Sequence, residues 1–96
     1  MSRIDTTARK LATLTGGTQR LDTVHISGGV AIVVVDHSID ICRTLVGRAP
    51  TYERLPAGLT YRQIAEHALA VANLLPGQVL PALGRAYGPW TLPVAA

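Results

Sequence analysis

The stretch from Val30 to Val35 is an unbroken run of six apolar residues, and five of them are β-branched. Such a run is typical of a β-strand that is apolar on both faces. Because side chains alternate along a strand, Val33 and Val35 point away from Ile32 and Val34. A local hairpin covers only one of these two sets. The run therefore predicts a strand whose second face is covered by other parts of the fold or by a second subunit.

The residues on either side of this run predict further antiparallel strands. From Leu21 to Ser27 apolar and polar side chains alternate, and Gly28 and Gly29 supply the positive φ values of a tight hairpin turn. Residues 39–46 fit two interpretations, because their apolar positions satisfy both strand and helix spacing. The strand is favoured by their β-forming Ile, Thr and Val residues and by the short turn before them. Residues 47–59 contain two prolines and two glycines, which predicts a surface loop.

Two helices are predicted to flank the sheet. In the first, residues 3–14 place Ile4, Ala8 and Leu11 on one stripe. The second begins after Thr60, which has the spacing of a capping box with Gln63. Leu59 and Ile64 occupy the positions of a hydrophobic staple around the same cap, and a Pro-Gly pair at 76–77 ends the helix.

These elements predict one α+β domain over residues 1–96, since chains divide into several domains only well above this length. It consists of an N-terminal helix, a three-stranded antiparallel sheet and a C-terminal helix pair. The third strand of the sheet is the ambiguous segment 39–46. The second helix of that pair is a short one over residues 78–87. Pro89 and Pro93 keep the tail extended, so residues 89–96 are a candidate C-terminal arm.

The formal net charge of +3 slightly favours an anionic partner. Four of the nine cationic residues lie in the first twenty positions, where Asp5 is the only acid, and they form the candidate polyanion-binding set: Arg3, Arg9, Lys10 and Arg20. The alternative is that these residues simply belong to a solvated helix face and loop.

Cys42 is the single cysteine, which fits a reducing compartment. The N-terminal residues lack the apolar stretch of a signal peptide, and no apolar run is long enough to span a bilayer. A cytoplasmic protein without a membrane partner is therefore expected. Cys42 and Arg48 have the Cys-x5-Arg spacing of a phosphate cradle, but bulky Leu45 and Val46 intervene and no hydroxyl follows Arg48. We therefore expect Cys42 to be a buried structural residue.

The three histidines, His25, His37 and His67, do not have the spacing of metal ligands on one helix. Ordinary solvated histidines are expected, with no metal site, no cofactor and no catalytic set. An enzymatic activity is consequently not predicted.

The function favoured by this small size and missing chemistry is a non-enzymatic macromolecule-binding module that acts by protein–protein contact. Accessory, regulatory and phage-type inhibitor proteins are often of this kind. The alternative is a nucleic-acid-binding regulator that uses the Arg-rich N-terminal segment, and a remote alternative is an enzyme built on Cys42 and Arg48.

A homo-oligomer, most simply a dimer, is also predicted, because the valine run needs a second cover and the sheet leaves two edges. Its candidate interface residues are Val33, Val35, Trp90 and Leu92. The segment around Trp90 has two interpretations: it folds back on its own core, or it docks on a second subunit.

Overall fold

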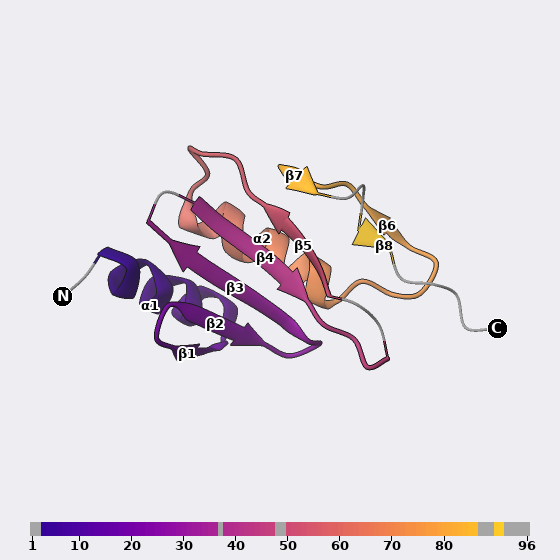
Figure 1. Ribbon diagram of the computed structural model, residues 1–96, viewed down its shortest axis with the longest axis horizontal. Helices are drawn as coiled ribbons and strands as arrows, with labels where there is room; N and C mark the ends of the chain where they lie inside the picture. The colour runs from indigo at the N-terminus through magenta and orange to yellow at the C-terminus, as the bar shows by residue number, and fades with distance from the viewer. Residues whose placement is uncertain (1–2, 37, 48–49, 87–89, 92–96) are drawn as a thin grey trace.

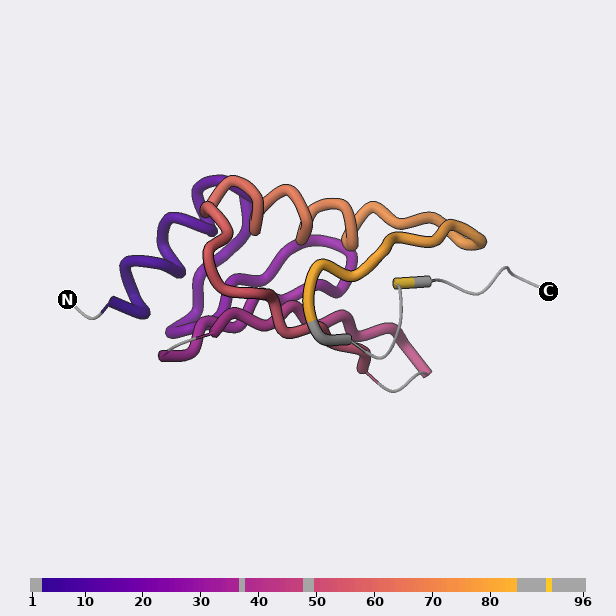
Figure 2. The backbone as a smooth tube through the Cα atoms, turned by 90° about the horizontal axis from the view of Figure 1, so that it is seen from above, coloured from indigo at the N-terminus to yellow at the C-terminus, as the bar shows by residue number. Residues whose placement is uncertain are grey.

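Two helices lie side by side on one face of an antiparallel sheet (Figure 1). The computed structural model describes residues 3–36, 38–47, 50–86 and 90–91. Helix α1 spans Arg3–Thr15 and helix α2 spans Tyr61–Ala72. Turned by 90°, the chain shows both helices along one side and the strands of the sheet along the other (Figure 2). The described chain therefore has two layers, with the helices covering only one side of the sheet.

The main sheet is an antiparallel meander in which each of the first four strands pairs with the next along the chain. A sixth, two-residue strand, β7, pairs with β5 at one edge, and β6 pairs with β8 in a separate two-stranded ribbon. The strands are β1 (Thr18–Arg20), β2 (Thr23–Ile26), β3 (Val30–Val35), β4 (Ser38–Arg43), β5 (Thr51–Arg54), β6 (Val79–Leu80), β7 (Arg85–Ala86) and β8 (Trp90–Thr91).

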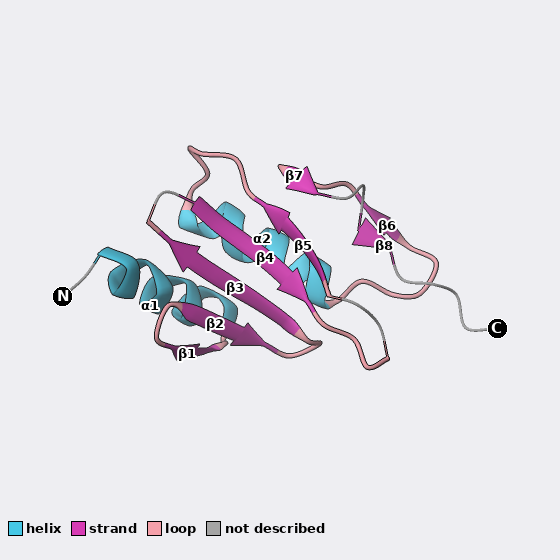
Figure 3. Cartoon of the chain, in the orientation of Figure 1, coloured by secondary structure: helices cyan, strands magenta, loops and turns pink. Residues whose placement is uncertain are grey.

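The prediction of a three-stranded sheet and a C-terminal helix pair is wrong. The α+β class, the N-terminal helix and a strand at the ambiguous position (β4) agree with the structure, but the sheet also contains β1, β5 and β7. Among the described residues α2 is the only helix after the sheet (Figure 3). The segment predicted as a short helix holds β6 and β7 instead. The rest of the predicted extended tail falls largely outside the described residues.

Two of the missing strands, β5 and β7, escaped prediction because each depends on a partner strand beyond its neighbouring residues. Strand β5 lies between Pro50 and Pro56, and the prolines limit its length without preventing its pairing with β4. Strand β7 has two residues, and it exists because Arg54 and Glu53 of β5 lie beside it. Neither strand has the length or alternation that a local pattern would reveal.

The hydrophobic core lies between the sheet and the helices. In β3 the inward positions Val30, Ile32 and Val34 are buried. The helices contribute apolar stripes to the same core, and its buried members are Ala8, Leu11, Val24, Val30, Ile32, Val34, Ile41, Leu55, Ile64, Ala68, Val71, Leu74 and Trp90. The valine run thus buries one of its two sets of side chains against the helices, as a strand in a two-layer fold must.

Two local predictions are confirmed. Gly28 and Gly29 have φ values of 97° and 77° in the turn between β2 and β3, which pair antiparallel. At the start of α2, the Gln63 amide donates to the Thr60 hydroxyl and the Thr60 amide donates to the Gln63 side chain. This is the predicted capping box. Within the described residues, both helices are too short or too polar to cross a membrane.

Candidate interaction face

The side of the main sheet opposite the helices is named here the outer face. Alternation along the strands assigns to it the residues that do not point at the core. They are Thr18 and Arg20 of β1, Thr23 and His25 of β2, Ala31, Val33 and Val35 of β3, Ser38, Asp40 and Cys42 of β4, and Tyr52 and Arg54 of β5.

The strand register arranges these residues in rows across the sheet. In the central row, Thr23 lies opposite Val33, and Val33 lies opposite Asp40. Arg20 and Arg54 form the two ends of this row. The next row runs in the order Thr18, His25, Ala31, Cys42 and Tyr52. The central strand β3 is therefore apolar on the outer face, with Thr23 and Asp40 on either side of Val33, and both ends of the central row are cationic.

The predicted interface residues Val33 and Val35 lie on this face. Val33 is half-buried by its neighbours in the sheet, and Val35 is 38% exposed. Tyr52 at the β5 side is 47% exposed. No helix of the described chain packs over these residues, so the second cover that the valine run requires is not supplied by that part of the chain.

An ion pair borders the apolar centre on the β5 side. The Arg54 guanidinium donates from Nε to Asp40 Oδ1 at 3.0 Å and from Nη2 to Asp40 Oδ2 at 3.3 Å. The hydrogen bonds from Arg54 to Asp40, and the charge of that carboxylate, raise the pKa of the guanidinium. The Arg54 guanidinium therefore stays positively charged across the physiological range.

Cys42 is half-buried on the outer face, between Ala31 and Tyr52 of the neighbouring strands. It is less buried than expected, because β4 points it away from the helices. Arg48, the other half of the Cys-x5-Arg spacing, lies outside the described residues.

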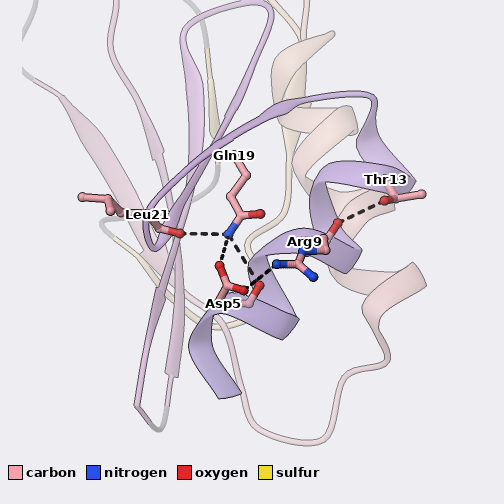
Figure 4. A network of polar contacts seen from close by, with 5 residues as sticks. All are labelled: Asp5, Arg9, Thr13, Gln19 and Leu21. Carbon is pink, nitrogen blue, oxygen red and sulfur yellow. Dashed lines mark hydrogen bonds and ion pairs between the residues drawn. The ribbon is translucent and has the colours of Figure 1, made fainter. Parts of the chain in front are cut away.

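The four cationic residues of the candidate polyanion set do not form one cluster. Arg9 donates to Asp5 of the same helix at 2.8 Å (Figure 4). The Lys10 ammonium lies 5.2 Å from the centre of the Tyr61 ring on α2, and Arg3 lines a cavity beside the same tyrosine. Arg20 points from β1 toward the outer face, away from the helices.

A buried carboxylate holds the C-terminal segment to the sheet. Glu53 of β5 has no exposed surface. Its Oε1 accepts from His67 Nε2 and Trp90 Nε1, both at 2.7 Å, and its Oε2 accepts from the amides of Leu83 at 2.6 Å and Gly84 at 2.7 Å. Burial raises the pKa of the Glu53 carboxyl, but the hydrogen bonds from His67, Trp90 and Gly84 and the electrostatic interaction with His67 together lower it below its usual value.

This network corrects the expectation of solvated histidines. His67 is 7% exposed and lies on the inward side of α2, whereas His25 is exposed and His37 lies outside the described residues. No group of three potential metal ligands occurs among the residues that the structure describes. Trp90 is 6% exposed and belongs to the core of its own chain, and Leu92 lies outside the described residues.

A buried arginine joins the end of α2 to the sheet. Arg43 of β4 is 7% exposed and donates to the carbonyl oxygens of Val71 at 2.7 Å, Ala72 at 3.4 Å and Gly28 at 3.1 Å. Burial lowers the pKa of its guanidinium. A cation at a helix C-terminus is favourable because the last carbonyls have no intrahelical partners.

Sequence reasoning missed both Glu53 and Arg43. The position of His67 was an available signal, because it falls three residues after Ile64 and four before Val71 on the apolar stripe of α2. A histidine on that stripe needs a buried partner, as does the indole N–H of a buried tryptophan.

The chain matches no protein family model, and comparisons with curated proteins and with solved structures also find no match.

Proposed function

We propose that this chain is a non-enzymatic protein-binding module of an accessory or regulatory kind, and that it makes its contact through the outer face. The observation that supports this function is the apolar centre formed by Ala31, Val33, Val35 and Cys42 on the side that the described helices leave open. A one-sided antiparallel sheet usually carries polar residues on its open side. Exposed apolar patches are typical of interaction sites.

The partner that fits this face is a second copy of the chain. Two copies can face each other with their outer faces in contact, related by a twofold axis that runs parallel to β3 and lies midway between the two sheets. This rotation places β1 of one copy over β5 of the other. Because Arg20, Val33 and Arg54 belong to one row, this operation brings Val33 against its own copy. It also lays Arg20 directly opposite Arg54 of the other copy, with Asp40, the partner of Arg54, one strand away.

The second row is also self-complementary under this rotation. Small Ala31 falls on the axis, and large Tyr52 falls opposite small Thr18. Facing sheets pack about 10 Å apart when large side chains meet small ones. An isologous dimer of this kind covers the second face of the valine strand in both copies.

Light scattering after size-exclusion chromatography tests the dimer over a range of concentrations. Val33→Glu places two like charges against each other on the axis, so we expect the wild type to be a dimer and this variant to be a monomer. Val46→Glu is the matched control, because Val46 is fully exposed in a turn and the same substitution there should leave the dimer intact. A wild-type monomer at high concentration contradicts the proposed self-association.

The nucleic-acid alternative gives a different result in a second measurement. Binding of DNA or RNA through Arg3, Arg9, Lys10 and Arg20 should weaken by nearly one log unit per phosphate contact for each tenfold increase in salt. Such binding, lost on substitution of these residues and unaffected by Val33→Glu, would replace the protein-binding proposal.

A further inference from the structure

A cavity of about 310 Å³ opens at one end of the two-layer fold. It lies between the first turns of α1, the ends of β3 and β4, and the loop that leads from β5 to α2. Its volume is within the range of about 300–1,000 Å³ that is typical of small-molecule sites.

The cavity has an apolar floor and a polar rim. The floor is formed by residues of the core and by aliphatic side chains packed against it: Ile4, Val34, Ile39, Leu55, Leu59 and Ile64. The rim carries Arg3, Thr7, Asp36, Ser38 and Tyr61. The hydroxyls of Thr7 and Tyr61 lie 3.4 Å apart and are hydrogen-bonded to each other, with Thr7 buried and Tyr61 38% exposed. A molecule with an apolar body and one polar head fits this division.

The charges around the mouth favour an anionic head. Arg3 lines the rim, and Lys10, which does not line the cavity, lies near it, with its ammonium 5.2 Å from the ring centre of the lining residue Tyr61. Tyr61 is the first residue of α2, and a helix N-terminus carries a partial positive charge. Asp36 is the only acidic residue among those lining the cavity. The positive groups therefore outnumber the negative one.

The volume limits the size of the apolar body. An apolar cavity of about 150 Å³ holds a molecule of benzene, which has six carbon atoms. A site of about 310 Å³ is roughly twice as large, so a chain of about eight to ten carbon atoms fills it.

We propose that this cavity binds a small amphiphilic carboxylate, with the chain on the apolar floor and the carboxylate at Arg3 and the Tyr61 hydroxyl. The floor of this site belongs to the inner side of the sheet, and the site adjoins the outer face at Val35 and Ser38, which line the cavity as well. The proposal assigns ligand binding to the chain in addition to protein contact.

Three ligands with the same eight-carbon chain and different heads test the proposal: octanoate, octanol and octylamine. Calorimetric titration, below the concentrations at which these compounds form micelles, should give the tightest binding for octanoate and the weakest for octylamine. In two-dimensional NMR spectra the amide shifts should centre on residues 34–39 and 55–64.

Two arginine variants separate the proposed site from general surface charge. Arg3→Gln should weaken octanoate binding by about two- to fivefold, the effect of one exposed ion pair, and leave octanol binding unchanged. Arg9→Gln is the matched control on the same helix, because Arg9 pairs with Asp5 and does not line the cavity. It should leave octanoate binding unchanged.

Ile39→Phe, checked for folding by circular dichroism, should fill part of the floor and weaken octanoate and octanol equally. Absence of octanoate binding to the wild type, a preference for octylamine, or equal loss in both arginine variants would overturn the proposal.

Discussion

Glu53 is a charged residue whose side chain is fully buried in the folded protein. A buried carboxylate is tolerated only when its oxygens are satisfied by hydrogen bonds, and here four donors supply them. Three of the donors belong to Leu83, Gly84 and Trp90, so one side chain orders the chain after α2. Hydrogen bonds to charged groups contribute about 1.5–3 kcal/mol each, so Glu53 contributes substantially to the stability of this segment.

Replacing Glu53 with Gln should destabilise the protein by about 3–5 kcal/mol, the usual cost of breaking a buried charged network. The new amide group keeps the shape of the side chain but places a donor against the donors of Trp90 or Gly84. Urea denaturation measures the free energy of unfolding. Glu66→Gln is the control, because Glu66 is exposed on α2, and it should change that free energy little.

The same carboxylate gives the stability a defined dependence on pH. Because the pKa of Glu53 is lower in the folded chain than the ordinary value of 4.5, its contribution is complete above that value and is lost as the pH falls through the folded pKa. Below about pH 4.5 the wild type should therefore lose stability more steeply than Glu53→Gln. Parallel slopes for the two proteins between pH 5 and pH 3 would show that folding does not lower the pKa of Glu53.

Arg43 and Arg54 lie on neighbouring strands but should respond differently to replacement by Leu. Arg43→Leu leaves the carbonyls of Val71, Ala72 and Gly28 without their donor, and we expect a loss of about 2–4 kcal/mol. Arg54→Leu breaks a solvent-exposed pair with Asp40 and should have little effect on the thermal midpoint. Equal midpoints for the two variants would contradict the structural role of Arg43.

At the scale of elements, the predictable parts of the fold are those with local causes. The capping box fixes the start of α2, and Gly28 and Gly29 fix the turn before β3. The short strands β5 and β7 have no such local signal, because their order comes from partners further away in the chain. Strand β1 pairs with nearby β2, but its three residues are too few to show alternation. Similarly, the valine run predicted Val33 and Val35 as interface residues. The positions of Arg20 and Arg54 at the ends of the Val33 row depend on the strand register, which the sequence does not reveal.

The turn between β1 and β2 carries a strain that can be measured. Leu21 has a φ of 57°, which is unfavourable for a leucine, and its side chain is 89% exposed. Asn tolerates this conformation better, so Leu21→Asn should stabilise the protein by about 0.5–1 kcal/mol, part of the cost of about 1–2 kcal/mol for a left-handed residue. Thermal unfolding measures the gain. A lower midpoint would show that Leu21 makes a stabilising contact.

At the scale of the whole molecule, the proposed twofold axis makes a prediction about distances. Residue 33 meets its own copy across facing sheets, whereas Cys42 is one strand off the axis and lies about 14 Å from its copy, from two strand spacings and one sheet spacing. In a Cys42→Ser background, Val33→Cys should be crosslinked rapidly by a short bis-maleimide, and Val46→Cys should not. Wild-type Cys42 should react more slowly than Val33→Cys. If Cys42 were crosslinked faster than Val33→Cys, the twofold axis would lie nearer to β4 than to β3.

The position of Glu53 in the chain also sets an order of events during synthesis. Its partner Trp90 follows 37 residues later, which at about 5–20 residues per second is a delay of about 2–7 s. Hairpins form in microseconds, so β4 and β5 can pair long before that indole reaches the ribosome exit. For those seconds the nascent sheet holds a carboxylate without its full set of donors. Completion of this core therefore follows the pace of translation.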